Sequence, residues 1–119
     1  MHDIRPAELD PWTSEQIITC HDKATGLRAV IAIDDTTLGP GFGGVRLAEY
    51  PSAQAAIVEA QRLAAAMTRK HALAELPYGG AKSVILLDGS VPEGAARERL
   101  FAAFGKFIAR SPELYIPGV

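Results

Sequence analysis

Two lysines twelve residues apart are the side chains of this sequence whose types and spacing point most directly to chemistry. Lys70 lies near the end of an alanine-rich segment, and Lys82 stands at the start of the apolar run 81–87. We expect the turn at Gly79 and Gly80 to bring the two ammonium groups close together. Because an unpaired lysine is costly to bury, such a pair indicates a cleft for an anionic small molecule, or a lysine that takes part in proton transfer.

The glycines around these lysines favour the same interpretation. The N–H group of a glycine can approach a carboxylate or phosphate because no Cβ stands in the way. The segment "GPGFGGVR" (39–46) supplies a second set of such groups, but it has neither the P-loop pattern nor the G-x-G-x-x-G spacing of dinucleotide-binding loops. Taken alone, it is equally well explained as a glycine-rich turn between a strand and a helix.

Structural explanations compete with these functional ones. Lys70 falls in the last turns of a predicted helix, where a cation is favourable and the side chain can extend to water. His2, His21 and His71 form no metal-ligand pattern, so no metal site is predicted. We expect His71 to lie at the surface or to be hydrogen-bonded in the interior.

The elements that must position these residues follow the order strand, strand, loop, helix, strand, helix, strand. Two β-rich runs, 14–22 and 27–33, predict a hairpin, and the second is apolar enough to be covered on both faces. The glycine-rich stretch 34–50 predicts no regular element. The rest of the chain predicts a helix at 53–74 that Ser52 caps and Pro77 stops, a strand at 81–87, a helix at 93–110 that Pro112 ends, and a strand at 114–116.

Helices that separate strands require crossover connections, and these favour parallel pairing. We therefore predict an α/β fold with three layers, built on a mixed, largely parallel sheet with an N-terminal antiparallel hairpin. Residues 1–14 are predicted to be an irregular lead-in, with room for one helical turn.

Composition narrows the function classes. The chain has 119 residues, enough for one domain, with 48% hydrophobic and 22% charged residues. Its net charge is −2 and its basic residues are scattered, which argues against nucleic-acid binding. Cys20 is the only cysteine, so no internal disulfide forms. No apolar run has signal-peptide or bilayer-spanning length, so we expect a cytoplasmic domain that does not contact membranes.

Three segments together resemble a known family. They are "IAIDDTTLGPGFGGVRL" (31–47), "AMTRKHALAELPYGGAKSVI" (66–85) and "YIPGV" (115–119). In order and spacing they are similar to the N-terminal domain of the Glu/Leu/Phe/Val dehydrogenases, with the leucine, valine and phenylalanine enzymes as the nearest branch. The resemblance runs from about residue 15 to the end. It implies that residues 15–119 are a substrate-binding and oligomerisation domain that forms homo-oligomers.

The resemblance also implies a reaction and assigns two roles. The family catalyses reversible oxidative deamination of an L-amino acid to a 2-oxo acid and ammonia, with hydride passing to NAD or NADP. Lys70 matches the residue that binds the substrate α-carboxylate. Lys82 matches the catalytic lysine, which polarises the α-carbonyl. Physically, one lysine would neutralise a carboxylate while the other stabilises negative charge that develops on oxygen.

Four further residues match the family's amino-acid pocket. Gly43 and Gly44 match the glycine pair that lines the pocket, and Met67 matches a residue beside it. Phe42 stands where leucine dehydrogenases have leucine in the side-chain pocket. We expect the larger ring to shrink the pocket and to favour small or branched aliphatic substrates.

The sequence also departs from the family pattern. The family usually has glycine at positions 75 and 81, where this chain has Glu75 and Ala81, and it has other residues at Arg69 and Tyr78. We expect Ala81 to be tolerated if its φ is negative, and Glu75 to weaken the binding of an anionic substrate.

The largest departures concern the catalytic and cofactor groups. In the family a catalytic aspartate follows the strand that resembles "YIPGV", and a separate nucleotide-binding domain holds the cofactor. These 119 residues contain neither, so we expect them to hold the substrate half, to bind no cofactor and to be inactive alone. The alternative is a stand-alone, non-catalytic module of the same fold that binds an amino or oxo acid or assembles with a partner.

Overall fold

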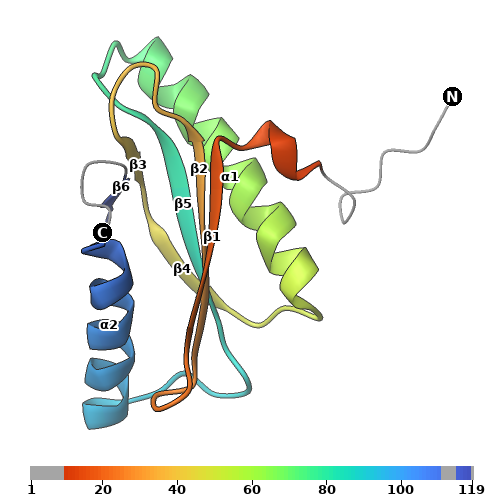
Figure 1. The fold of residues 1–119 in the computed structure, drawn as a ribbon, viewed down its shortest axis with the longest axis vertical. Coiled ribbons are helices and arrows are strands. Elements are labelled where there is room, and N and C mark those ends of the chain that lie inside the picture. The colour runs from red at the N-terminus through yellow and green to blue at the C-terminus, as the bar shows by residue number, and fades with distance from the viewer. Residues whose placement is uncertain (1–9, 111–114, 119) are drawn as a thin grey trace, which may run out of the picture.

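The computed structural model describes residues 10–110 and 115–118, and these build one six-stranded mixed sheet between two helices (Figure 1). In chain order, the elements are a 3-10 turn (Pro11–Thr13), β1 (Gln16–Asp22), β2 (Leu27–Asp35), β3 (Gly41–Gly43), β4 (Val45–Ala48), α1 (Ala53–Leu73), β5 (Gly79–Leu86), α2 (Gly94–Ile108) and β6 (Tyr115–Pro117). The strand order is β1-β2-β5-β3-β6, and β4 also pairs with β5. The predicted α/β fold with a mixed sheet is confirmed.

The predicted hairpin forms the antiparallel part of the sheet. β1 pairs with β2 from Gln16 opposite Ile33 to Asp22 opposite Leu27, and β2 pairs antiparallel with β5. β3 and β4 run parallel to β5, and β6 runs parallel to β3. The Asp22 carboxylate closes the hairpin turn by accepting hydrogen bonds from the N–H and hydroxyl of Thr25.

β2 is covered on both faces, as its apolar run predicted. Side chains of a strand alternate between faces, so Ala29, Ile31 and Ile33 belong to one core cluster and Val30 and Ala32 to the other. The first cluster packs against α2 and the second against α1. The sheet and its two helices therefore form the three expected layers.

Helix α1 begins where the sequence indicates and ends earlier than its proline. The hydroxyl of Ser52 accepts from the N–H of Ala55 at 3.1 Å, which confirms the predicted N-cap. The helix stops at Leu73, before Pro77 is reached. Glu75 takes a positive φ of 57°, and the N–H of Leu76 reaches back to the carbonyl of His71 at 2.9 Å. This Schellman motif ends the helix.

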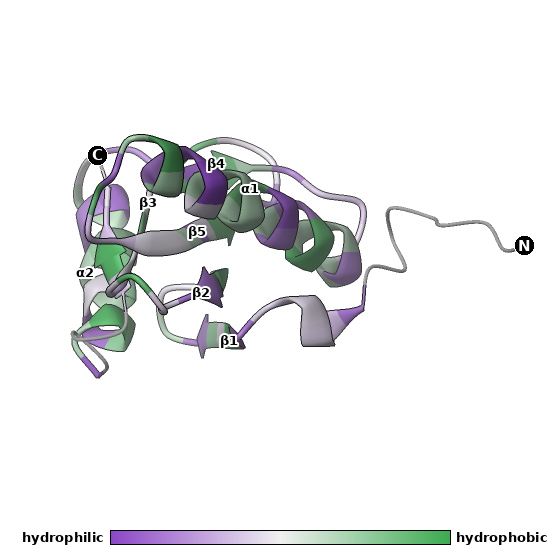
Figure 2. Ribbon diagram, turned by 90° about the horizontal axis from the view of Figure 1, so that it is seen from above, coloured by the Kyte–Doolittle hydropathy of each residue, from purple (hydrophilic) through white to green (hydrophobic). Residues whose placement is uncertain are grey.

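Alanines on α1 allow it to lie close to the sheet. Ala56, Ala60 and Ala64 are fully buried against Val30 and Val84. In Figure 2 green and purple stretches alternate along the ribbon of α1, as expected for a helix with one side on the sheet and the other facing out. None of the described helices is long and apolar enough to cross a membrane.

Helix α2 covers the opposite face and is shorter than predicted at both ends. It runs over Gly94–Ile108, and Leu100 and Phe104 are its buried side chains. They pack in the core cluster that includes Ile31, Ile33 and Tyr115. The predicted stop at Pro112 and the predicted strand start at Leu114 lie outside the described residues.

The prediction that 34–50 contains no regular element is wrong. β2 extends to Asp35, and the glycine-rich stretch contains β3 and β4, two short strands parallel to β5. The glycines are there because the strand backbones meet closely: a Cβ on Gly43 would overlap the carbonyl oxygen of Ala81. Glycine in this segment marks close backbone approach within a sheet, which composition alone cannot distinguish from a loop.

Candidate functional site

The two predicted lysines lie on the same side of the sheet. Lys82 is paired with Ala32 in the β2–β5 register, and Ala32 belongs to the core cluster that packs against α1. Side chains opposite each other in a ladder share a face, so Lys82 also points to the α1 side. Lys70 lies in the last turn of α1 itself. Lys82 is half-buried and Lys70 is exposed.

The ammonium group of Lys82 lies beside the second glycine of the predicted pair. A Cβ built on Gly44 would come within 3.1 Å of Nζ of Lys82. The carbonyl oxygen of Gly44 accepts from the N–H of Ser83 at 3.1 Å, which fixes the glycine against β5. The absence of a side chain at residue 44 therefore leaves space for the lysine head group and for whatever it binds.

Gly43, the first glycine of the pair, faces the backbone of β5, whereas Gly44 faces the ammonium group of Lys82. Its missing side chain faces the carbonyl of Ala81, and its own carbonyl oxygen accepts from the N–H of Gly118 at 2.6 Å. The hydroxyl of Tyr115 also approaches this oxygen, at 3.4 Å, and accepts from Ser83 at 2.6 Å. Gly43 thus holds β3, β5 and β6 together, and its carbonyl is engaged within the fold.

Met67 and Lys70 share one stripe of α1 with Glu59. Glu59 pairs with Arg46 of β4 at 2.8 Å and accepts from the Tyr50 hydroxyl at 3.0 Å, so this stripe faces β4. Steps of three and four residues place Met67 and Lys70 on the same side of the helix, two and three turns further on. Met67 is half-buried there.

Phe42 belongs to an aromatic cluster that the sequence did not indicate. Its ring stacks on His71 with 5.6 Å between centroids and an interplanar angle of 14°, and lies 5.3 Å from the ring of Tyr78. His71 is only 3% exposed, and its Nδ1 lies 2.8 Å from the carbonyl oxygen of Gly79. Of the two alternatives expected for His71, a surface position or a hydrogen-bonded interior position, the structure shows the second. The available signal was the spacing of His71 from Ala64 and Thr68, which places it on the buried stripe of α1.

The structure shows the backbone conformation or the burial of the residues that depart from the family pattern. Glu75 is the only non-glycine residue with positive φ in the described part of the chain, at the position where a helix favours glycine. Ala81 is fully buried and does not have a positive φ, so the expected tolerance of its Cβ holds. Arg69 is exposed on α1.

The positive charges of Lys70 and Lys82 have no carboxylate partner in the described part of the chain. Within residues 10–110 and 115–118, neither Lys70 nor Lys82 forms an ion pair with a carboxylate, whereas Arg46 does. Two cations on one side of a sheet, one of them beside a bare glycine, can bind an anion and can donate hydrogen bonds to an oxygen that gains negative charge. The same described residues contain no cluster of His, Cys, Asp or Glu that could hold a metal ion.

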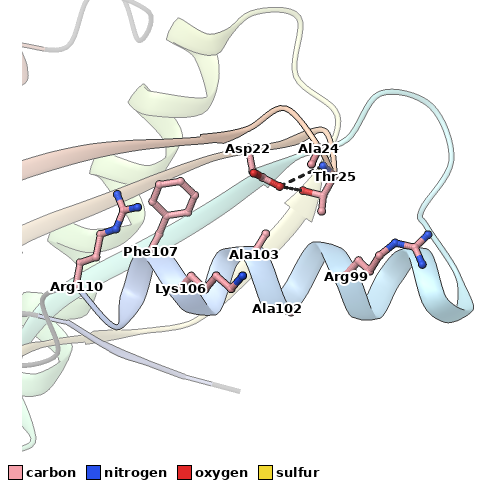
Figure 3. A pocket seen from close by; sticks show the side chains of 9 residues that line it. All are labelled: Asp22, Ala24, Thr25, Arg99, Ala102, Ala103, Lys106, Phe107 and Arg110. Carbon is pink, nitrogen blue, oxygen red and sulfur yellow. Dashed lines mark hydrogen bonds between the residues drawn. The ribbon is translucent and has the colours of Figure 1, made fainter.

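A second basic region lies apart from the lysine pair. Asp22, Thr25, Lys106 and Arg110 line a hollow of about 410 Å³ between the hairpin turn and α2 (Figure 3). The guanidinium of Arg110 lies 4.7 Å over the ring of Phe107, and the Asp22 carboxylate is turned toward Thr25. This hollow borders α2, across the sheet from α1, and it includes neither Lys70 nor Lys82.

Comparison with known proteins supplies relatives. Residues 14–117 match the family model described as "Glu/Leu/Phe/Val dehydrogenase, dimerisation domain". The chain is 49% identical over 100 residues to leucine dehydrogenase of Bacillus cereus, covering 84% of this chain and 26% of that protein. It is 43% identical over 107 residues to valine dehydrogenase of Streptomyces coelicolor, covering 90% of this chain and 29% of that protein.

A solved structure agrees with the sequence matches. L-tryptophan dehydrogenase from Nostoc punctiforme superposes with a TM-score of 0.79 at 38% sequence identity, over 89% of this chain and 30% of that one. The chain therefore spans between a quarter and a third of the length of these relatives.

Proposed function

The chain belongs to the Glu/Leu/Phe/Val dehydrogenase family, and on this premise we propose that residues 15–119 are the substrate-binding and oligomerisation domain of an amino-acid dehydrogenase. The proposed reaction is the reversible oxidative deamination of an L-amino acid to a 2-oxo acid and ammonia. The observation that carries the proposal is the ammonium of Lys82, which lies beside Gly44 on the α1 side of the sheet with no carboxylate partner among the described residues.

Each lysine has a distinct role in this proposal. Lys70 pairs with the α-carboxylate of the substrate, and its exposure at the end of α1 leaves it accessible to a ligand that arrives from solvent. Lys82 donates a hydrogen bond to the oxygen on the α-carbon. That oxygen gains negative charge when water or ammonia adds to the carbonyl, so the cation stabilises the transition state more than the ground state.

The proposed substrates are small or branched aliphatic amino acids. Phe42 lies on the same side of the sheet as Lys82 because it is paired with Gly80, whose missing side chain faces α1. Its ring is fixed by contacts with His71 and Tyr78, so it forms a rigid wall rather than a movable one. Met67 lines the same side from α1. Two of the relatives are named for leucine and valine, which supports this preference.

The implied NAD or NADP does not fit the residues described. The amides of a dinucleotide-binding loop open a helix and leave space for a pyrophosphate, whereas Gly41–Gly43 forms β3 inside the sheet. A Cβ on Gly43 or Gly79 would overlap the protein's own backbone, so no cradle for phosphate exists there. No step of hydride transfer is assigned to these residues, and we expect no cofactor bound to them.

A homo-oligomer is the proposed assembly. The family model that matches is a dimerisation domain, and β1 is one edge of the sheet, with β2 as its partner. An edge strand can extend its pairing into a second copy. Sedimentation analysis is expected to show a species larger than the 12.7 kDa monomer. A monomer at every concentration would contradict this part of the proposal.

Binding of 4-methyl-2-oxopentanoate, followed by NMR titration, tests the assigned roles. We expect weak binding to the wild type and a loss of about tenfold or more in Lys70→Ala and in Lys82→Ala, because each removes a charge-assisted contact. Lys106→Ala removes a lysine from α2, across the sheet, and is expected to bind like the wild type. Unchanged affinity in Lys70→Ala would refute the carboxylate role.

A further inference from the structure

A single peptide group is held at both ends by two side chains of α1. The carbonyl oxygen of Gly79 lies 2.8 Å from Nδ1 of His71, and the adjoining N–H of Gly80 donates to Oγ1 of Thr68 at 3.0 Å. A carbonyl oxygen only accepts hydrogen bonds, so Nδ1 of His71 carries the proton. Thr68 and His71 are three residues apart and therefore share one face of the helix.

β2 completes the arrangement. The hydroxyl of Thr68 donates to Oδ2 of Asp34 at 2.6 Å, which leaves its oxygen to accept from Gly80. Asp34 stands where the β2–β5 register shifts, and such irregularities re-aim a side chain. Asp34 thereby orients the hydroxyl of Thr68.

The approach of β5 to α1 at this point depends on glycine. A Cβ on Gly80 would overlap the carbonyl oxygen of Ala64 and the backbone nitrogen of Thr68. The two elements therefore meet with backbone against backbone, and the clamped peptide is the place where their relative position is fixed.

We propose that Thr68 and His71 form a clamp on the Gly79–Gly80 peptide that sets the position of Lys82 relative to Lys70, and that His71 is a positioning residue of the site. Lys70 lies between the two clamp residues in α1, and Lys82 follows the clamped peptide by two residues in β5. A shift of β5 along α1 would change the distance between the two ammonium groups and with it their fit to one ligand.

His71 has a second contact that serves the same site. Its ring stacks on Phe42, so one side chain holds both the start of β5 and the proposed wall of the substrate pocket. The geometry of the clamp is independent of the proposed function, although its consequence for 2-oxo acid binding rests on that function.

His71→Asn and His71→Leu provide the test. The amide of asparagine can still donate to Gly79, whereas leucine fills a comparable volume without a donor. Affinity for 4-methyl-2-oxopentanoate is expected to fall about tenfold or more in H71L, because small misplacements of binding groups are costly. It is expected to fall less in H71N, which keeps the donor to Gly79 and loses only the ring that stacks on Phe42. Thr68→Ser and Thr68→Val repeat the comparison at the other end of the peptide.

Leu100→Ala is the matched control for lost stability. Leu100 is buried on α2, on the other face of the sheet, so its truncation lowers the melting temperature without touching the clamp. L100A is expected to keep its affinity for the 2-oxo acid. An equal loss of affinity in L100A, or an unchanged affinity in both H71L and T68V, would overturn the positioning role.

A ligand-free measurement separates this inference from the proposed function. The acetylation rate of Lys82 relative to Lys106, followed by mass spectrometry, reports how readily Lys82 leaves its place beside Gly44. We expect this ratio to rise about threefold or more in H71L and T68V and to stay near the wild-type value in H71N, T68S and L100A. A wild type that binds no 2-oxo acid would refute the proposed function, and an unchanged ratio in H71L and T68V would refute the clamp.

Discussion

Replacing Glu75 by glycine is expected to stabilise the protein, because the backbone at this position has a conformation that suits glycine. Glu75 has a φ of 57° in the Schellman motif that ends α1. The left-handed conformation costs a residue with a Cβ about 1–2 kcal/mol. Glycine avoids that cost but loses about 0.4–1 kcal/mol through the greater freedom of the unfolded chain. The net gain from the backbone is therefore about 0.5–1 kcal/mol.

The expected change is large enough to measure in a chain of this size. An entropy of unfolding of about 2.1 cal/mol/K per residue gives about 250 cal/mol/K for 119 residues. A gain of ~0.5–1 kcal/mol then raises the melting temperature by about 2–4 °C. Thermal unfolding followed by circular dichroism and urea unfolding at 25 °C provide two independent measurements of the same change.

Glu75→Gln is the control that separates backbone from charge. A carboxylate at the C-terminal end of a helix is unfavourable, so its removal adds a few tenths of a kcal/mol in both variants. The backbone contribution is the difference between E75G and E75Q. If E75Q is as stable as E75G, the positive φ of residue 75 is not the source of the gain and the reasoning fails.

Three further predictions concern other elements. Gly43→Ala is expected to lower the free energy of unfolding by about 3 kcal/mol or more, because its Cβ would overlap backbone of β5. Its control is Gly105→Ala on α2, where the Cβ meets nothing within 4 Å. This variant should raise the free energy of unfolding by about 0.5–1 kcal/mol in the same urea assay. Ser52→Ala removes the N-cap of α1 and should lower the stability by about 1 kcal/mol, whereas Ser52→Gly should lower it by only a few tenths of a kcal/mol. Thermal unfolding measures both changes. Burial raises the pKa of Tyr115 from 10.0 to about 12. Its contribution to stability is therefore present below pH 10 and lost as the pH rises to 12, so urea unfolding of Tyr115→Phe should show a smaller fall over that interval.

Features that depend on near neighbours in the chain were predictable. Ser52 caps α1 through an N–H three residues away, and the hairpin turn closes through Asp22 and Thr25. The apolar run 27–33 indicated a strand buried on both faces, and β2 is that strand. The two lysines were identified from residue type and spacing, and the structure places them on the same side of the sheet.

Features that depend on contacts between residues far apart in the chain were not predictable from the sequence. The segment 34–50 has the composition of a loop, yet β3 and β4 form because β5 provides a ladder about forty residues further along the chain. Phe42 was expected only to reduce a pocket, and its contacts with His71 and Tyr78 became visible once β3 was placed beside β5.

By itself the sequence determined the residue types of the candidate site, the helix that carries Lys70 and the strand that carries Lys82. Only the tertiary structure decided how those two elements meet. The hydrogen bond from Thr68 to Asp34 joins residues 34 positions apart, and the peptide between Gly79 and Gly80 is bonded at both ends to α1. Such contacts require a particular docking of helix on sheet, and propensity and periodicity act over only a few residues. Which backbone atoms come together is therefore settled by packing, and in this fold it is glycine that allows them to do so.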